Sequence, residues 1–175
     1  MARLNRGFVA FVLSTAMALS ATICYAGITK VVIDTENSKK PTFGGYSWQG
    51  VGQYEKVVGT AYGEIDPKDP KNSIIVDLGL APVNAKGHVE YSFNFYILKP
   101  VDLTRGNHKV MYEPPNRGRK LWEHFARVPS GNDPGTTITD PATLANAFLM
   151  PRGYTMVWSG WDQTEIGRAS CRERV

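Results

Sequence analysis

The sequence has very little cysteine: Cys24 and Cys171 are the only two among its 175 residues, and each lies near one end of the chain. Such a pair cannot supply the disulfide framework of a small secreted domain, so the fold is expected to depend on an ordinary hydrophobic core. Histidine is also scarce. His88, His108 and His124 lack the close spacing of metal ligands, and no metal or other cofactor is predicted.

The sequence also lacks a large excess of basic over acidic residues. The whole chain has 20 Lys+Arg and 16 Asp+Glu, and 15 basic and 14 acidic residues remain when residues 1–26 and 165–175 are set aside for the reasons given below. A nearly neutral chain gives no argument for binding nucleic acid or an anionic membrane surface, so neither is predicted as a partner.

A long apolar stretch occurs only near the N-terminus. Arg3 and Arg6 precede the apolar residues 8–23, and a small residue, Ala26, comes directly before Gly27. This order is typical of a secretory signal peptide cleaved between Ala26 and Gly27. Because the stretch is shorter than the roughly 20 apolar residues that a spanning helix needs, no stable membrane anchor is predicted. The mature protein is expected to be periplasmic or secreted.

The opposite end has an unusual composition. The last eleven residues, 165–175, fit the translation of a common short-read sequencing adapter in a single frame. The genuine sequence is therefore expected to end near Thr164, inside a domain. A natural basic tail with one cysteine is the alternative.

Strand patterns dominate residues 27–108. Strands are expected at residues 28–34, 54–65, 73–78 and 88–98. A glycine-rich aromatic segment, 43–52, is expected to be irregular, and Asp66 and Asp69 are expected to bond local backbone in a proline-rich turn. In the last strand an apolar row alternates with a more polar one, which predicts a half-buried antiparallel strand. That row consists of Val89, Tyr91, Phe93, Phe95 and Ile97.

From residue 109 the pattern changes. A short strand, 109–112, precedes polar loops and a helix that Asp140 can cap, with Pro141 in the first position, and an apolar strand, 154–158, follows Gly153. Strand, loop, helix and buried strand predict the start of a parallel α/β layer. The expected organisation is a signal peptide (1–26), a β-rich region (27–108), the start of an α/β core (109–164) and the adapter-derived tail (165–175).

Three segments together resemble a known family: residues 54–102, 116–118 (Asn-Arg-Gly) and 153–161 (Gly-Tyr-Thr-Met-Val-Trp-Ser-Gly-Trp). They are similar to the N-terminal part of bacterial exported proteins called alpha/beta hydrolase domain proteins, and the resemblance covers essentially residues 27–163. It implies an incomplete α/β hydrolase fold, in which a β-rich region precedes the first strand–helix–strand elements of the core. It also implies a serine esterase or related acyl hydrolase whose substrate is a small ester-type molecule.

The catalytic signature of such an enzyme is missing from this sequence. A serine hydrolase needs a nucleophile in a G-x-S-x-G turn, followed by an acid and a histidine. Ser159 is the nearest approach, but Trp158 stands where the first glycine is needed. We therefore expect Ser159 to be structural, the triad to lie beyond residue 164, and the chain to be inert by itself.

The loop after strand 109–112 is the predicted contribution to catalysis. Its Asn116, Arg117 and Gly118 are the candidates for donating a backbone N–H to an oxyanion, with Gly118 allowing close approach. Pro114 and Pro115 have no N–H to donate. The alternative is a surface loop whose Arg117 pairs with a carboxylate.

A second function class remains open from the sequence. The chain fits a secreted β-rich module that binds carbohydrate or a protein partner, with Trp48, Tyr54 and Tyr62 forming an exposed aromatic platform. The helix and apolar strand at residues 140–158 favour the hydrolase hypothesis over this one.

Overall fold

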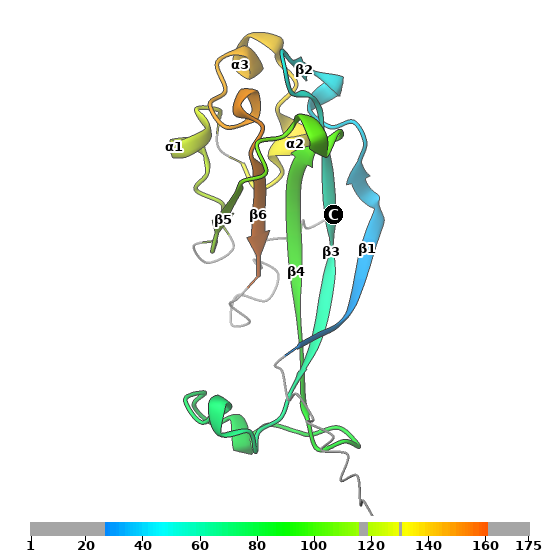
Figure 1. Ribbon diagram of the computed structural model, residues 1–175, viewed down its shortest axis with the longest axis vertical. Coiled ribbons are helices and arrows are strands. Elements are labelled where there is room, and N and C mark those ends of the chain that lie inside the picture. Colours follow the sequence, from blue (N-terminus) through cyan, green and yellow to red (C-terminus); the bar gives the residue numbers. More distant parts are fainter. Residues whose placement is uncertain (1–26, 116–118, 130, 161–175) are drawn as a thin grey trace, which may run out of the picture.

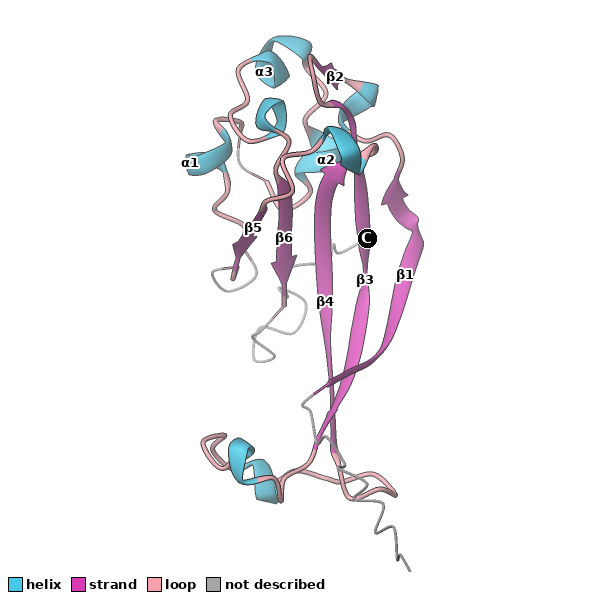
Figure 2. Cartoon of the chain, viewed as in Figure 1, coloured by secondary structure: helices cyan, strands magenta, loops and turns pink. Residues whose placement is uncertain are grey.

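The computed structural model describes residues 27–115, 119–129 and 131–160. The predicted signal peptide, the predicted adapter-derived tail and residues 116–118 lie outside this part. The described residues form one sheet whose upper end is covered by short helices and loops, while a long hairpin extends from its lower end (Figures 1 and 2).

The sheet has six strands in a mixed arrangement. In chain order they are β1 (Gly27–Lys39), β2 (Ser47–Trp48), β3 (Gly52–Ile65), β4 (Val89–Pro100), β5 (Val110–Glu113) and β6 (Thr155–Ser159). The spatial order is β1-β3-β4-β6-β5, and β2 pairs with β3 beside this path. All neighbours are antiparallel except β5 and β6, which are parallel. The strands predicted at 28–34, 54–65, 88–98, 109–112 and 154–158 are thereby confirmed.

The helices are short. They are α1 (Glu123–Ala126), α2 (Pro134–Thr137) and α3 (Pro141–Ala145), with single 3₁₀ turns η1 (Phe43–Gly45), η2 (Pro70–Asn72), η3 (Leu78–Leu80), η4 (Leu103–Arg105) and η5 (Met150–Arg152). Asp140 caps α3 as predicted, because its carboxylate accepts the backbone N–H groups of Ala142 and Thr143. Hydrogen bonds from the side chain and backbone of Thr143 lower the pKa of Asp140.

The predicted incomplete α/β hydrolase fold is wrong. The described sheet is mixed, and its three helices have only four or five residues each, so they form no helical layer of the kind that fold requires. The segment between β5 and β6 is divided into separate short elements. Helix α1 ends before Arg127, which has a left-handed conformation with a φ of 56°. Pro134, Pro141 and Pro151 each stand in the first turn of a new element, where a fixed φ and a missing N–H are tolerated.

The strand predicted at residues 73–78 is also wrong. The chain leaves the sheet after Ile65 and returns to it at Val89, and the segment between consists of turns with η2 and η3. This segment, residues 66–88, is called the arm below. Its run Ile74–Val76 is apolar but pairs with none of the described strands, and Ile74 and Val76 are 85% and 84% exposed. Asp66 and Asp69 accept the backbone N–H groups of Lys68 and Lys71, which confirms their predicted local hydrogen bonding.

The main core lies on one face of the sheet. Its sheet members are Trp48 of β2, Tyr54 and Val58 of β3, Tyr96 and Leu98 of β4, and Met156 and Trp158 of β6. The register between the strands places these side chains on the same face of the sheet, because Val58 pairs with Tyr96 and Leu98 pairs with Met156. Trp122, Leu144 and Met150 complete the core from the segment between β5 and β6.

The apolar row predicted to be the buried side of β4 faces the other way. Phe93, Phe95 and Ile97 alternate with Tyr96 and Leu98 and lie outside the main core, although Phe95 is buried, with 8% of its surface exposed. The register of β1, β3, β5 and β6 places apolar side chains of these strands on the same second face. We call it the open face: Val31, Ile33, Val57, Tyr91, Phe93, Phe95, Ile97, Val110, Tyr112 and Val157.

Two glycines of β3 make room for aromatic rings on the open face. A Cβ atom on Gly59 would lie 2.2 Å from the carbonyl oxygen of Val32 and 2.8 Å from Cζ of Phe95. A Cβ atom on Gly63 would lie 2.3 Å from the ring of Tyr91. Phe95 and Tyr91 stand directly opposite these two glycines in β4, so each ring lies across the backbone of the neighbouring strand.

Gly59→Ala is expected to lower the free energy of unfolding by about 1–3 kcal/mol, because the new methyl group meets backbone that cannot move without disturbing the ladder between β1 and β3. Urea denaturation would measure the change. Gly79→Ala in the arm is the matched control, since no atom lies within 4 Å of its added Cβ, and its stability should change little. Equal stabilities of the two variants would contradict the close packing at Gly59.

Candidate functional site at the carboxyl ends of β5 and β6

The two parallel strands end side by side. Tyr112 of β5 stands opposite Val157 of β6, and Glu113 stands opposite Trp158. In open sheets that contain parallel strands, ligands commonly bind just beyond the carboxyl ends, because the following loops converge there. This edge, with the loop that begins at Pro114, is the candidate site.

An accessible pair of hydroxyl groups stands at this edge. The phenol oxygen of Tyr112 lies 2.7 Å from Oγ of Ser159, and the Tyr112 side chain is exposed. Both residues lie on the open face. Tyr112 is the second-last residue of β5, and Ser159 is the last residue of β6. Such a pair can donate to and accept from one polar group of a ligand.

Glu113 has a structural role beside this pair. Its carboxylate accepts a 2.6 Å hydrogen bond from Nε1 of Trp158 and a 2.5 Å hydrogen bond from the backbone N–H of Leu121. The first contact ties β5 to the buried end of β6, and the second ties the end of the loop back to the strand. The loop that follows β5 is therefore anchored at both of its ends.

A buried ion pair supports the site from the core side. Nζ of Lys56 lies 3.0 Å from both carboxylate oxygens of Asp133 and 2.8 Å from Oγ1 of Thr136. The hydroxyl of Tyr96 donates to Asp133 at 2.7 Å and accepts the backbone N–H of Gly135 at 3.0 Å. This cluster fastens the loop around α2 to β3 and β4.

A second buried cation lies between this cluster and β6. Nζ of Lys120 is 4.3 Å from the ring centre of Tyr96 and 5.9 Å from that of Trp158, and it also donates to the carbonyl oxygen of Asn132. The backbone N–H of Lys120 donates to Oδ1 of Asn132. Cation–π contacts of this kind are strongest where water is excluded, and Lys120 is almost completely buried.

The residues predicted to line an oxyanion hole, Asn116, Arg117 and Gly118, lie outside the described residues. Their neighbours are described: Pro114 is exposed and Pro115 is buried. Ser159 is the last residue of β6, and its described hydrogen-bond partner is Tyr112 rather than a histidine.

The three histidines are on separate parts of the molecule. Nδ1 of His88 lies 3.1 Å from a carboxylate oxygen of Glu64 at the base of the arm, and hydrogen bonds from His88 and Lys86 lower the pKa of Glu64. His108 lies in the loop before β5, with a φ of 58°, and His124 is exposed on α1. Among the described residues, no group of three or more His, Cys, Asp and Glu side chains has the geometry to hold a metal ion.

The exposed aromatic platform expected from Trp48, Tyr54 and Tyr62 is wrong. Trp48 and Tyr54 are buried in the main core, 5.3 Å apart between ring centres, and only Tyr62 is exposed. The hydroxyl of Tyr54 donates toward the carbonyl oxygens of Tyr154 and Met150, and burial raises its pKa. Gly50, with a φ of 82°, lies in the turn that joins β2 to β3.

The comparisons with known proteins add no family to this description. The chain matches no family model, no curated protein and no solved structure. Within the described residues, no helix is long and apolar enough to cross a membrane. The parts of the sequence-based hypothesis that concern function and partners therefore stay proposals.

Neither the hydroxyl pair nor the buried ion pair was predicted from the sequence. Tyr112 and Ser159 are 47 residues apart, and Lys56 and Asp133 are 77 residues apart. Only the pairing of β5 with β6 brings the first two together, and only the packing of the loop around α2 on β3 joins the second two. Neither pair is marked by a local pattern in the sequence.

Proposed function

We propose that this chain is the N-terminal, non-catalytic part of an exported serine hydrolase that acts on small carboxylic esters. The observation that carries the proposal is the parallel pair β5–β6, whose carboxyl ends meet at one edge with an accessible hydroxyl pair and a loop anchored at both ends. The resemblance of residues 54–102, 116–118 and 153–161 to exported hydrolases gives the chemical class.

The proposed contribution of this chain is to bind and orient substrate. The loop after β5 begins with two prolines, so any backbone donor to a developing oxyanion comes from residue 116 or later. Asn116, Arg117 and Gly118 are the proposed donors. The hydroxyls of Tyr112 and Ser159 stand at the same edge and would contact the part of the substrate that extends along the open face.

The nucleophile, acid and histidine are proposed to come from sequence that this chain does not contain. In the described part, none of the hydrogen bonds found joins a serine to a histidine, and Ser159 is paired with Tyr112. The chain by itself is therefore proposed to be inert. The apolar stretch at residues 8–23 supports export through a signal peptide, with a periplasmic or secreted product.

Two measurements test this proposal together. A long sequencing read of the source DNA across codon 164 is expected to continue in frame and to encode a G-x-S-x-G motif, then an acid and a histidine. The longer protein is expected to hydrolyse short-chain p-nitrophenyl esters, and replacing the serine of that motif with alanine should abolish the activity, whereas the present chain should show none.

The Tyr112→Phe variant of the longer protein tests whether the Tyr112 hydroxyl helps to orient the substrate. The substitution removes one hydroxyl and keeps the ring. We expect a higher KM with little change in kcat, because the group contacts substrate away from the reacting carbonyl. A frame that ends naturally near residue 164, or continues without a nucleophile motif, would overturn the hydrolase proposal. The function as a partner-binding module would then be the better hypothesis.

A further inference from the structure

Strand β1 forms one outer edge of the sheet, and none of the described strands pairs with its outer side. The strand order places β1 at one end and β5 at the other, and Figure 1 shows β1 on the side of the sheet away from β5. Alternate backbone N–H and C=O groups of an edge strand point away from its sheet. Such an edge is a template for pairing with another strand.

The regular part of this edge is five residues long. Residues 30–34 pair with β3 without interruption, whereas the register shifts between Ile28 and Lys30 and again between Asp34 and Lys39. The three central residues are apolar and exposed: Val31 (55%), Val32 (41%) and Ile33 (44%). A run of exposed β-branched side chains on an outer strand is a composition that proteins usually avoid at an edge without a partner.

A charged residue of opposite sign stands at each end of this stretch. Lys30 and Asp34 are four residues apart, so their side chains lie on the same face of β1, with Val32 between them. Hydrogen bonds from the side chain and the backbone N–H of Asn37 lower the pKa of Asp34. In the part of the chain that the structure describes, neither charge forms an ion pair.

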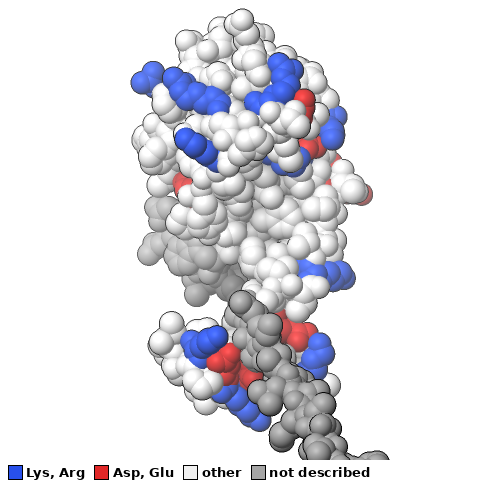
Figure 3. All heavy atoms as spheres, in the orientation of Figure 1, with Lys and Arg blue, Asp and Glu red and all other residues white. Residues whose placement is uncertain are grey.

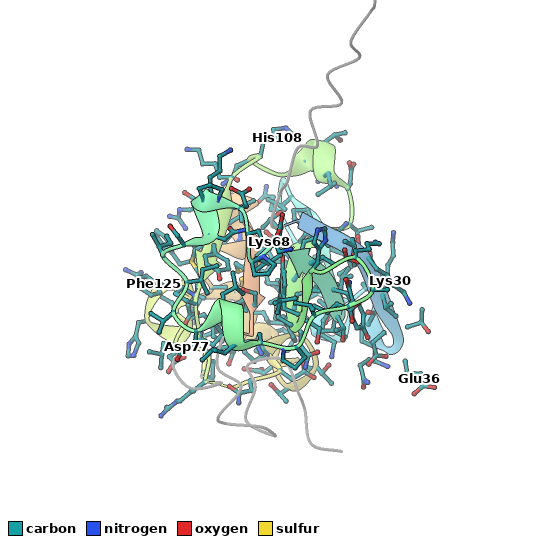
Figure 4. All side chains as sticks on the ribbon, turned by 90° about the horizontal axis from the view of Figure 1, so that it is seen from below. Lys30, Glu36, Lys68, Asp77, His108 and Phe125 are labelled. Carbon is teal, nitrogen blue, oxygen red and sulfur yellow. The ribbon has the colours of Figure 1, made fainter. Side chains whose placement is uncertain are left out.

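Both charges are accessible. Nζ of Lys30 lies 5.6 Å from the ring centre of Tyr62, a contact that leaves the donors of the ammonium group available. Seen from below, Lys30 and Glu36 lie at the periphery of the molecule, on the side opposite to Phe125 (Figure 4). Side chains of both signs are visible along the right-hand side of Figure 3, where β1 lies in the same view, so the approach of a second copy meets no excess of one charge.

The stretch is complementary to a second copy of itself. When two copies of β1 are aligned antiparallel with Val32 opposite Val32, Lys30 of each copy stands opposite Asp34 of the other. Val31 then stands opposite Ile33, so every remaining pair is apolar. Opposite charges in directly opposed positions of antiparallel strands attract, and apolar pairs also stabilise the pairing.

The same pattern selects the register. A shift of two residues is the smallest that keeps each side chain on its own face of the sheet. In one direction this shift would place Lys30 opposite Val32, and in the other it would place Asp34 opposite Val32. Either shift loses both charge pairs, so the alignment about Val32 is the favoured one.

We propose that two copies of this chain form a symmetric dimer by antiparallel pairing of β1 with β1 about a two-fold axis at Val32. The two sheets join into one, and each copy covers the free edge of the other, so the assembly closes at two chains. The proposal goes beyond the proposed catalytic role and does not depend on it, because the candidate site lies at the other end of the strand order.

The dimer is expected to be weak and reversible. A standard interface involves roughly 20–30 residues on each side, whereas the regular part of this edge has five. Sedimentation velocity over a wide concentration range measures the association. The chain would be produced by export to the periplasm and carry Cys171→Ser, so that its own thiol forms no intermolecular disulfide.

Charge reversal tests the two charge pairs. Lys30→Glu places a carboxylate opposite Asp34 at both ends of the contact, and Asp34→Lys places an ammonium group opposite Lys30. Each variant alone should raise the dissociation constant about tenfold or more, because two attractive pairs become repulsive. In an equimolar mixture of the two variants both pairs are attractive again. The mixture should contain a heterodimer at concentrations where each variant alone is a monomer.

Two controls separate association from folding. Lys39→Glu makes the same change of charge on β1 outside the regular stretch and should dimerise like the parent chain. Asp34→Asn keeps an oxygen acceptor for the backbone N–H of Asn37 and loses only the charge, so it should weaken the dimer less than Asp34→Lys. Circular dichroism would show that each variant keeps its fold.

A cysteine at the two-fold axis tests the register. Directly opposed residues of antiparallel strands have Cα atoms about 4.5–5.5 Å apart, a separation that a disulfide spans. Under mild oxidation Val32→Cys should therefore link two chains through position 32, whereas Ile28→Cys, outside the regular stretch, should link few. A chain that is monomeric throughout, a dimer insensitive to Lys30→Glu, a mixture without heterodimer, or equal cross-linking at both positions would each overturn the proposal.

Discussion

Replacing Asp133 with alanine is expected to lower the free energy of unfolding by about 3–5 kcal/mol, the usual cost of breaking a buried ion pair from one side. The change leaves the ammonium group of Lys56, whose side chain is 2% exposed, without its carboxylate, in contact with the Thr136 hydroxyl and the ring of Tyr96. It also removes a 2.7 Å hydrogen bond from the Tyr96 hydroxyl. Urea denaturation followed by circular dichroism would measure the loss.

Two comparisons separate the buried charge from the general effect of mutation. In the Lys56→Met, Asp133→Leu double variant most of the lost stability should return, because apolar side chains of similar volume often replace a buried pair at little cost. Glu64→Ala breaks an exposed cluster with Lys86 and His88 and should change stability only slightly. If Asp133→Ala and Glu64→Ala had the same small effect, the buried pair would not contribute as its geometry indicates.

Trp158→Ala is expected to have a comparable effect, about 3–5 kcal/mol, because it empties the centre of the core. The Trp158 side chain is fully buried, and its ring meets those of Tyr96 and Trp122 edge to face, with centres 5.5 Å and 5.9 Å away. The change also removes the hydrogen bond that joins β6 to Glu113 of β5. Loss of cooperativity in a thermal melt would accompany the loss of stability.

Trp158→Phe is the matched variant for this position. It keeps a ring between Tyr96 and Trp122 but loses the indole N–H, so its cost should be clearly smaller than that of alanine. Tyr62→Ala removes an exposed aromatic side chain from the same sheet and should be nearly neutral. A Trp158→Ala protein as stable as Tyr62→Ala would show that the core is centred elsewhere.

The strands were predictable because their signals are local. Residues 54–65 and 88–98 combine β-branched and aromatic side chains with alternation, and they form β3 and β4. The start of α3 was predictable for the same reason, since Asp140 and Pro141 act on the turn that they begin. Its length was not, because the helix already ends at Ala145 and no local signal in the sequence marks that position.

The side of β4 that enters the core could not be predicted. Periodicity shows that Phe93, Phe95 and Ile97 share a face, but it does not show which face the rest of the chain covers. The structure places Tyr96 and Leu98 in the main core, while Phe95 is buried on the opposite face, outside that core. The strand predicted around Ile74–Val76 failed for a related reason: the run has the composition of a strand, yet none of the described strands pairs with the arm.

The candidate site was only partly predictable. The sequence located the loop after residues 109–112 and the end of the strand at Trp158, because both are boundaries of local elements. It gave no indication of the contacts that Tyr112, Glu113 and Lys120 make, since these depend on the parallel pairing of two strands separated by the whole helical segment.

The two glycines of β3 also have a consequence for how the long hairpin is aligned. A slip of two residues between β3 and β4 would keep every side chain on its proper face, so the apolar pattern alone does not oppose it. Such a slip would place Phe95 opposite Ala61 or Val57, and Tyr91 opposite Ile65 or Ala61, where a Cβ atom occupies the space that each ring now takes above Gly59 or Gly63. Two residues without side chains thus exclude the misaligned hairpins that the pattern of apolar residues would permit.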